Sequence, residues 1–112
     1  MKQFQVALLG FGTVGSGVYR IINENGAQIA HREGISLSVG RILVRDFEHE
    51  PNLNMAPREC FTTSFDEILS DAAIDIVVEC MGGIEPAKTF IIRALEAGKT
   101  VVTSNKEVMS KN

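Results

Sequence analysis

One glycine-rich stretch near the N-terminus, residues 10–15 (GFGTVG), has residue types and a spacing that can do chemistry. The preceding residues 4–9 (FQVALL) are apolar almost throughout, which is typical of a strand buried on both faces of a sheet. After the glycines the apolar residues follow a helical period. Those expected on one helix stripe are Val14, Val18, Ile21 and Ile22. The glycines therefore fall at a strand-to-helix turn, the context in which this motif binds the pyrophosphate of a dinucleotide.

Each glycine of the motif has a separate physical reason. Gly10 permits the tight turn off the strand, Gly12 lets the backbone approach a pyrophosphate, and Gly15 lets helix and strand pack closely. The first N–H groups of the helix have no partner within it, and together with the helix dipole they favour an anion. A glycine-rich turn that binds no nucleotide is the alternative, but the flanking strand and helix favour a nucleotide.

The first half of the chain continues with a helix and a second strand. The helix is expected from Thr13 to about residues 25–29, and a polar connection follows over residues 31–34. The strand is expected over residues 37–44, with Gly40 as a β-bulge.

The second half repeats this alternation. A polar surface loop over residues 47–59 leads to a short strand at residues 60–63. A helix over residues 65–70 follows, opened by Ser64 and Glu67 as a capping box. The remaining elements are a strand over residues 74–79, a helix opened by Pro86 and closed by Gly98, and a strand over residues 100–103.

This order of elements predicts an α/β fold, a doubly wound, Rossmann-like parallel sheet with strand order 3-2-1-4-5. In that order the first and fourth strands are neighbours. The turn at residues 10–15 and a second glycine turn at residues 81–83 then border one crevice. Ligands of open α/β sheets bind in this kind of crevice, at the carboxyl ends of the strands where the order reverses.

Arg45 and Asp46 follow the second strand, where folds of this type contact the adenosine ribose of a dinucleotide. An acid there accepts from the 2′-hydroxyl of NAD, whereas an arginine suits the 2′-phosphate of NADP. We expect NADP, with NAD as the second choice. A surface Arg–Asp pair without a ligand is the alternative.

Composition excludes several classes of protein. The chain has 112 residues, of which 45% are hydrophobic and 22% charged, as in one globular domain. A net charge of −3 gives no basic surface for nucleic acid, and no apolar run is long enough to span a bilayer. His31 and His49 are expected to be solvated, Cys60 and Cys80 to be buried structural thiols, and no metal is expected. Few cysteines and no room for a signal peptide favour the cytoplasm.

Lys106 lies just past the fifth expected strand, on the ligand side of the sheet. An ammonium group there can donate to a cofactor amide or polarise a carbonyl as hydride arrives. A solvated lysine at a helix start is the alternative, although cations are disfavoured at that end. Residues 106–112 begin a helical pattern without a cap, so we expect the N-terminal part of a longer protein.

The segments GFGTVG, MGGIEPA and VVTSNKE together resemble the N-terminal cofactor domain of homoserine dehydrogenase, over nearly the whole chain. The resemblance implies an enzyme that interconverts homoserine and aspartate 4-semialdehyde with NAD(P)H, on the route to threonine, methionine and isoleucine. In that family a later segment supplies the main proton-transfer Lys and Asp and the subunit contacts. We therefore expect residues 1–112 to bind cofactor without turnover, and the full-length protein to be a homo-oligomer.

The resemblance also assigns cofactor contacts. The pyrophosphate falls on residues 11–14, and the nicotinamide on residues 80–82 and on Lys106, in a supporting catalytic role. Many family members have Thr where this chain has Met81, so a hydroxyl contact is absent. The expected cofactor-binding residues are Gly10, Phe11, Gly12, Thr13, Val14, Gly15, Arg45, Cys80, Met81, Gly82, Thr103 and Lys106.

Two other functions use the same glycines. One is a non-enzymatic nucleotide-sensing module, which would not need Lys106 beside the nicotinamide. The other is a different NAD(P) oxidoreductase. Fold alone does not decide among them.

Overall fold

The computed structural model describes residues 2–83 and 85–103 and contains a parallel sheet of five strands in the order β3-β2-β1-β4-β5. This is the predicted order. The strands are Lys2–Leu9 (β1), Ile35–Leu43 (β2), Phe61–Thr62 (β3), Ile74–Glu79 (β4) and Thr100–Thr103 (β5). The helices are Thr13–Glu33 (α1), Phe65–Ser70 (α2) and Ala87–Glu96 (α3), with short 3-10 turns at Leu53–Met55 (η1) and Arg58–Cys60 (η2).

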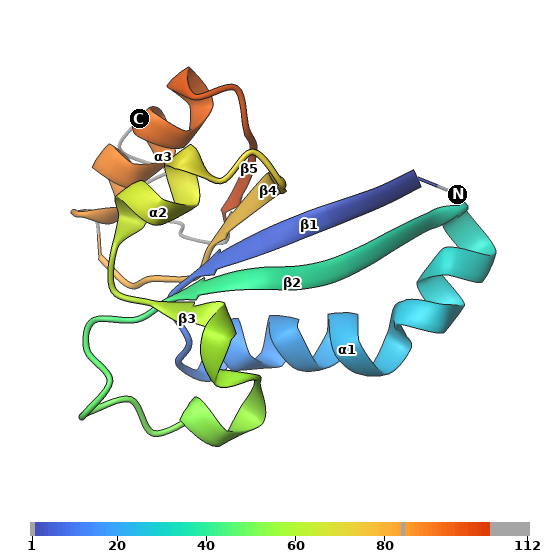
Figure 1. Cartoon of the computed structure of the whole chain (residues 1–112), viewed down its shortest axis with the longest axis horizontal. Coiled ribbons are helices and arrows are strands. Elements are labelled where there is room, and N and C mark those ends of the chain that lie inside the picture. The colour runs from blue at the N-terminus through green and yellow to red at the C-terminus, as the bar shows by residue number, and fades with distance from the viewer. Residues whose placement is uncertain (1, 84, 104–112) are drawn as a thin grey trace.

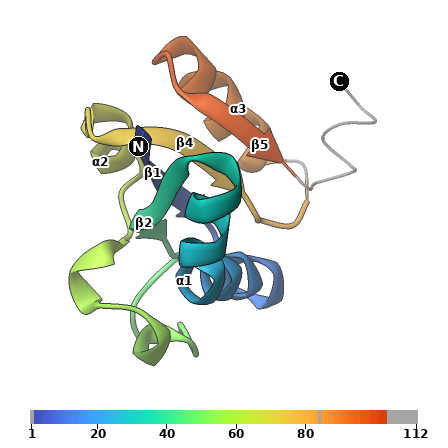
Figure 2. The same ribbon diagram turned by 90° about the vertical axis from the view of Figure 1, so that its right-hand side faces the viewer.

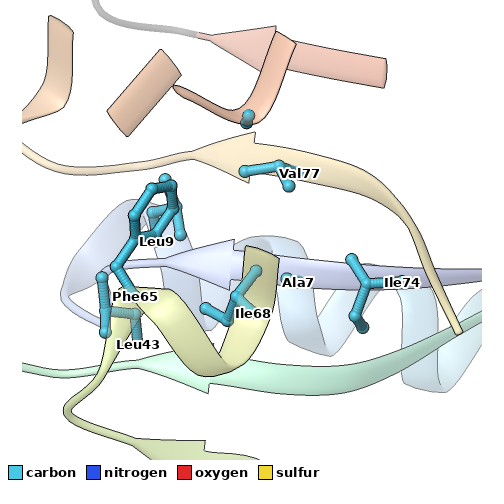
Figure 3. Close-up of a cluster of buried hydrophobic side chains, with 8 residues drawn as sticks. Ala7, Leu9, Leu43, Phe65, Ile68, Ile74 and Val77 are labelled. Atoms are coloured by element: carbon cyan, nitrogen blue, oxygen red, sulfur yellow. The ribbon is translucent and has the colours of Figure 1, made fainter. Parts of the chain in front are cut away.

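Helices cover both faces of the sheet, with α1 on one side and α2 and α3 on the other (Figures 1 and 2). The end of β1 is buried on both faces, which explains its continuous apolar run. Ala7 and Leu9 contribute to the core beneath α2 and α3, part of which Figure 3 shows. Val6 and Leu8 contribute to the core beneath α1. The central strand therefore joins both layers of the domain.

Gly40 forms the predicted bulge. Val6 of β1 pairs with Val39, but the next residue, Ala7, pairs with Arg41, so Gly40 is left as the extra residue of β2. A Cβ atom on Gly40 would lie 2.3 Å from Oε1 of Gln5. A side chain at this position would therefore have to displace the flexible end of the Gln5 side chain.

Helix α1 is longer than expected, and the expected connection over residues 31–34 is wrong. The helix runs to Glu33 and ends at Gly34, whose φ of +70° is left-handed and whose N–H donates to the Ala30 carbonyl at 3.0 Å. His31 and Arg32 lie in its last turn, where cations interact favourably with the helix dipole. The exposed end of this helix is rich in polar residues, so its composition resembles that of a loop, and this misled the prediction.

The expected apolar stripe of α1 is only half right. Val14 is 51% exposed and Ile21 is 56% exposed. Val18 and Ile22 do pack against the core, together with Tyr19.

The predicted capping box at the start of α2 does not form. Ser64 is the N-cap residue but makes no capping hydrogen bond through its side chain. Its N–H donates to Oγ1 of Thr62 at 3.0 Å, and that hydroxyl donates to the Glu67 carboxylate. The buried Thr62 at the end of β3 therefore takes the Ser64 N–H and engages the carboxylate that the capping box requires.

Candidate cofactor site

The turn from β1 into α1 requires glycine at its first position. Gly10 has a φ of +103°, and its N–H donates to the Leu43 carbonyl of β2 at 3.0 Å. A Cβ atom on Gly10 would lie 3.3 Å from the carbonyl oxygen of Cys80. The turn therefore packs directly against the end of β4.

Close packing of α1 against this turn explains the third glycine. A Cβ atom on Gly15 would lie 2.1 Å from the carbonyl oxygen of Gly10. A side chain at this position would push the helix away from β1. Gly15 thus fixes where the N-terminus of α1 lies, as its place in the motif predicts.

Gly12 faces open space. No atom lies within 4 Å of a Cβ built on it, and Gly12, Thr13 and Val14 are all exposed. Within residues 2–83 and 85–103 the N–H groups of these residues have no acceptor, and the first turn of α1 contains no acidic residue. A helix N-terminus with free N–H groups and no nearby acid favours an anion such as a phosphate.

The two predicted glycine turns border one crevice of about 510 Å³. They meet because β1 and β4 are adjacent, with the Cys80 N–H donating to the Leu9 carbonyl at 2.9 Å. The walls comprise Gly10, Phe11, Gly12, Leu43, Val44, Arg45, Glu50, Thr63, Phe65, Cys80, Met81, Gly82, Glu85, Pro86 and Phe90. The expected crevice at the reversal of strand order is therefore present and large enough for a ligand.

Two carboxylates line this crevice, and both accept hydrogen bonds from the chain. Glu85 accepts from the hydroxyl and the N–H of Thr89 in α3, and these bonds lower the pKa of its carboxyl. Glu50 accepts from the Asn52 N–H at 2.9 Å. These donors stabilise the negative charge of the two carboxylates on the crevice walls.

Glu79, at the end of β4, is a buried carboxylate that the motifs do not reveal. Its side chain is fully buried, and it accepts from the Met81 N–H and from the Thr103 hydroxyl, both at 2.6 Å. It thus joins the turn after β4 to the end of β5. An acid at the end of a mostly apolar strand is the sequence signal for this role.

The Cys80 side chain is half-buried rather than buried. Burial, and after it the charge of Glu79, raises the pKa of the thiol to about 11. Burial also raises the pKa of the half-buried Cys60. Cys80 is therefore a neutral thiol at physiological pH, which suits a wall residue and not a nucleophile.

Arg45 and Asp46 differ in their availability. Arg45 is exposed and lines the crevice, and no hydrogen bond or ion pair engages it within the described part of the chain. Oδ1 of Asp46 accepts from the His49 N–H at 2.7 Å and lies 2.9 Å from Nδ1 of its ring. The backbone hydrogen bond first, and the ring second, lower the pKa of Asp46. Of the pair, Arg45 is the one that lines the crevice, and Asp46 is not among the lining residues.

The Phe11 side chain cannot contact a ligand in the crevice. It is 2% exposed and packs edge-on against the rings of Tyr19 and Phe61. Its backbone carbonyl accepts from Nδ2 of Asn52 at 2.9 Å. The sequence gives no sign of this contact, because Asn52 lies in a polar loop far along the chain.

The remaining expected residues lie at the C-terminal end. Thr103 ends β5 and bonds to Glu79, so it lies at the carboxyl edge of the sheet beside the turn after β4. Lys106 and the helix expected after it lie outside the described residues. Among the residues that are described, no group of three or more His, Cys, Asp or Glu side chains could hold a metal ion. No helix in that same part of the chain has the length and apolar character to cross a membrane.

A doubly wound parallel sheet with a glycine turn and a helix N-terminus at the reversal of strand order defines a nucleotide-binding domain of the Rossmann type. Residues 10–112 match the family model for the NAD-binding domain of homoserine dehydrogenase. The chain belongs to this family.

The known proteins to which the chain is similar include homoserine dehydrogenases. Homoserine dehydrogenase of Bacillus subtilis is 38% identical over 110 residues, and that of Corynebacterium glutamicum 44% over 105 residues. These matches cover 98% and 94% of the chain. Among solved structures, Staphylococcus aureus homoserine dehydrogenase is 45% identical with a TM-score of 0.84 over 95% of the chain. That of Thiobacillus denitrificans is 39% identical with a TM-score of 0.88 over 99%.

The chain spans about a quarter of the length of these relatives: 25% and 23% of the first two, and 26% and 25% of the two structures. The fold and the family are thus shown for a domain, and the rest of each relative has no counterpart in this chain.

Proposed function

We propose that residues 1–112 form the nicotinamide-cofactor domain of an enzyme that interconverts homoserine and aspartate 4-semialdehyde. The observation that carries this proposal is the open helix N-terminus at Gly12, beside a crevice of about 510 Å³. Family membership supports the choice of cofactor and reaction over a non-enzymatic sensing module. The reaction belongs to the synthesis of threonine, methionine and isoleucine.

The domain binds and orients the cofactor, and the bound nicotinamide exchanges the hydride. N–H groups of Gly12, Thr13 and Val14 donate to the pyrophosphate. The turn at residues 80–82, which Glu79 fixes, forms the wall on the nicotinamide side. Lys106 has a supporting role as a donor near the nicotinamide and the substrate.

NADP is the cofactor that this site favours, with NAD as the second choice. Arg45 lines the crevice without an ion-pair partner in the described residues, whereas Asp46 is not a lining residue and one of its two carboxylate oxygens accepts from His49. A guanidinium group in that position matches a 2′-phosphate, whereas a carboxylate there would match the 2′-hydroxyl.

The remaining segments of the full-length protein supply proton transfer, the pocket for the small-molecule substrate and the contacts of a homo-oligomer. The setting that we propose is the cytoplasm. Cys60 and Cys80 are free thiols, which suits a reducing compartment.

The substitution Gly12→Ala tests cofactor binding. Space is open at Gly12, so the variant should fold, but the added methyl occupies the place of the pyrophosphate. We expect its Kd for NADPH, measured by calorimetry, to rise at least about tenfold. Gly17→Ala is the matched control, because Gly17 also has open space but lies outside the crevice. It should bind as the wild type and gain up to about 1 kcal/mol of stability.

Failure of the wild-type protein to bind either NADPH or NADH would refute the proposal. Equal affinity of the wild type and of Gly12→Ala for the cofactor would show that the cofactor does not bind at this turn.

A further inference from the structure

A side-chain hydrogen bond joins the connection between β2 and β3 to the glycine turn. Nδ2 of Asn52 donates to the carbonyl oxygen of Phe11 at 2.9 Å, across 41 positions of sequence. Beside this bond, Leu53 and Met55 of η1 pack against the core that contains the Phe11 ring. The apolar contacts place the connection, and the hydrogen bond selects one backbone group of the turn.

Asn52 is itself held in place. Its N–H donates to Oε2 of Glu50 at 2.9 Å, and its carbonyl accepts from the Met55 N–H at 3.0 Å. Its side-chain orientation is also determined, because a carbonyl oxygen accepts hydrogen bonds and the amide nitrogen is the only donor that the Asn52 side chain has. Asn52 is therefore a donor whose backbone and side chain are both fixed.

The carbonyl of Phe11 and the N–H of Gly12 belong to one planar trans peptide unit, in which they point in opposite directions. A bond that holds the carbonyl toward Asn52 therefore holds the N–H of Gly12 away from it. This N–H has no acceptor in the described residues, and Gly12 lines the crevice. The orientation of the peptide unit is thus set before any ligand arrives.

We propose that Asn52 is a positioning residue for the pyrophosphate: by fixing the Phe11–Gly12 peptide unit, it directs the Gly12 N–H into the crevice. This inference rests on the proposed cofactor binding. Without the Asn52 amide the peptide unit can rotate, and binding must then order it. The loss should therefore appear with every ligand that carries a diphosphate.

Two substitutions remove the donor and a third controls for charge. Asn52→Ala deletes the amide. Asn52→Asp keeps the size of the side chain but places a carboxylate oxygen, an acceptor, against the Phe11 carbonyl oxygen. Asn54→Asp adds the same charge to the same 3-10 turn, at an exposed residue with no hydrogen bond among the described residues. Calorimetric titrations use ADP, NADPH and adenosine 2′-monophosphate, the last of which has no diphosphate. Thermal unfolding verifies that each variant is folded.

We expect Asn52→Ala and Asn52→Asp to weaken ADP and NADPH about five- to twentyfold, the range of one well-placed hydrogen bond. Affinity for adenosine 2′-monophosphate should stay within about twofold, and Asn54→Asp should match the wild type. Equal losses with all three ligands, or a loss in Asn54→Asp as large as in Asn52→Asp, would overturn the inference. Absence of binding in the wild type would instead refute the proposed function.

Discussion

Arg45 is the exposed cation on the crevice wall, and it makes the choice of cofactor testable with one residue. Its neighbour Asp46 has the acidic side chain that NAD recognition uses, but it is not among the residues that line the crevice, and its Oδ1 accepts from His49. Local geometry therefore distinguishes two adjacent residues, of which the sequence already favoured the arginine and NADP.

We expect Arg45→Ala to weaken NADPH about ten- to a hundredfold and NADH less than about threefold. A charge-assisted hydrogen bond to phosphate is worth about 1.5–3 kcal/mol. NADH has no 2′-phosphate, so it does not make this bond and cannot lose it when Arg45 is replaced. Titration of both cofactors by quenching or calorimetry measures the ratio. Arg58→Ala is the control, because Arg58 stacks on the Phe47 ring and lies outside the crevice. Similar losses for both cofactors would remove the 2′-phosphate role of Arg45.

At the scale of elements, the crevice depends on how strand ends are joined. Glu79 connects the turn after β4 to the end of β5, and Asn52 connects the β2–β3 loop to the turn after β1. Each is one polar side chain that crosses between elements. Both contacts stabilise loops whose backbone lines the crevice.

Replacement of Glu79 should show this joining role. Glu79→Ala removes the acceptor of the Met81 N–H and the Thr103 hydroxyl, so we expect a loss of about 1–3 kcal/mol in the free energy of unfolding. Glu79→Gln keeps one acceptor oxygen and should lose less. Denaturant unfolding measures both against Glu96→Ala, at an exposed residue of α3 that should change stability by at most about 0.5 kcal/mol. A Glu79→Ala protein as stable as the control would contradict the role.

At the scale of the whole molecule, the proposed role of this chain is to bind the cofactor. Saturation with NADPH should raise its unfolding temperature, since a ligand at 100 times its Kd stabilises the folded state by about 2.7 kcal/mol. The same chain mixed with NADP and homoserine should give no detectable turnover, whereas the full-length protein should reduce NADP. Absorbance at the reduced nicotinamide band follows both reactions. Native-like rates from the 112-residue chain would place the proton-transfer residues within it.

Much of this domain could be predicted from its sequence, because the signals are local. Apolar runs and helical periodicity predicted the strands and helices, Gly40 predicted the bulge, and the strand–turn–helix context predicted the open helix N-terminus. The prediction failed where polar residues have more than one stable partner. Ser64 and Glu67 are both bonded to Thr62, and the polar end of α1 continues as helix until Gly34.

The sequence by itself determined the alternation of elements and the glycine turn, since backbone sterics and apolar periodicity act over a few residues. The tertiary structure alone decided which side chains stabilise the turns after β1 and β4. Asn52 is 41 positions from Phe11, and Thr103 is 24 positions from Glu79. Such contacts have no periodic pattern, because they depend on which loops the sheet order brings to the same edge.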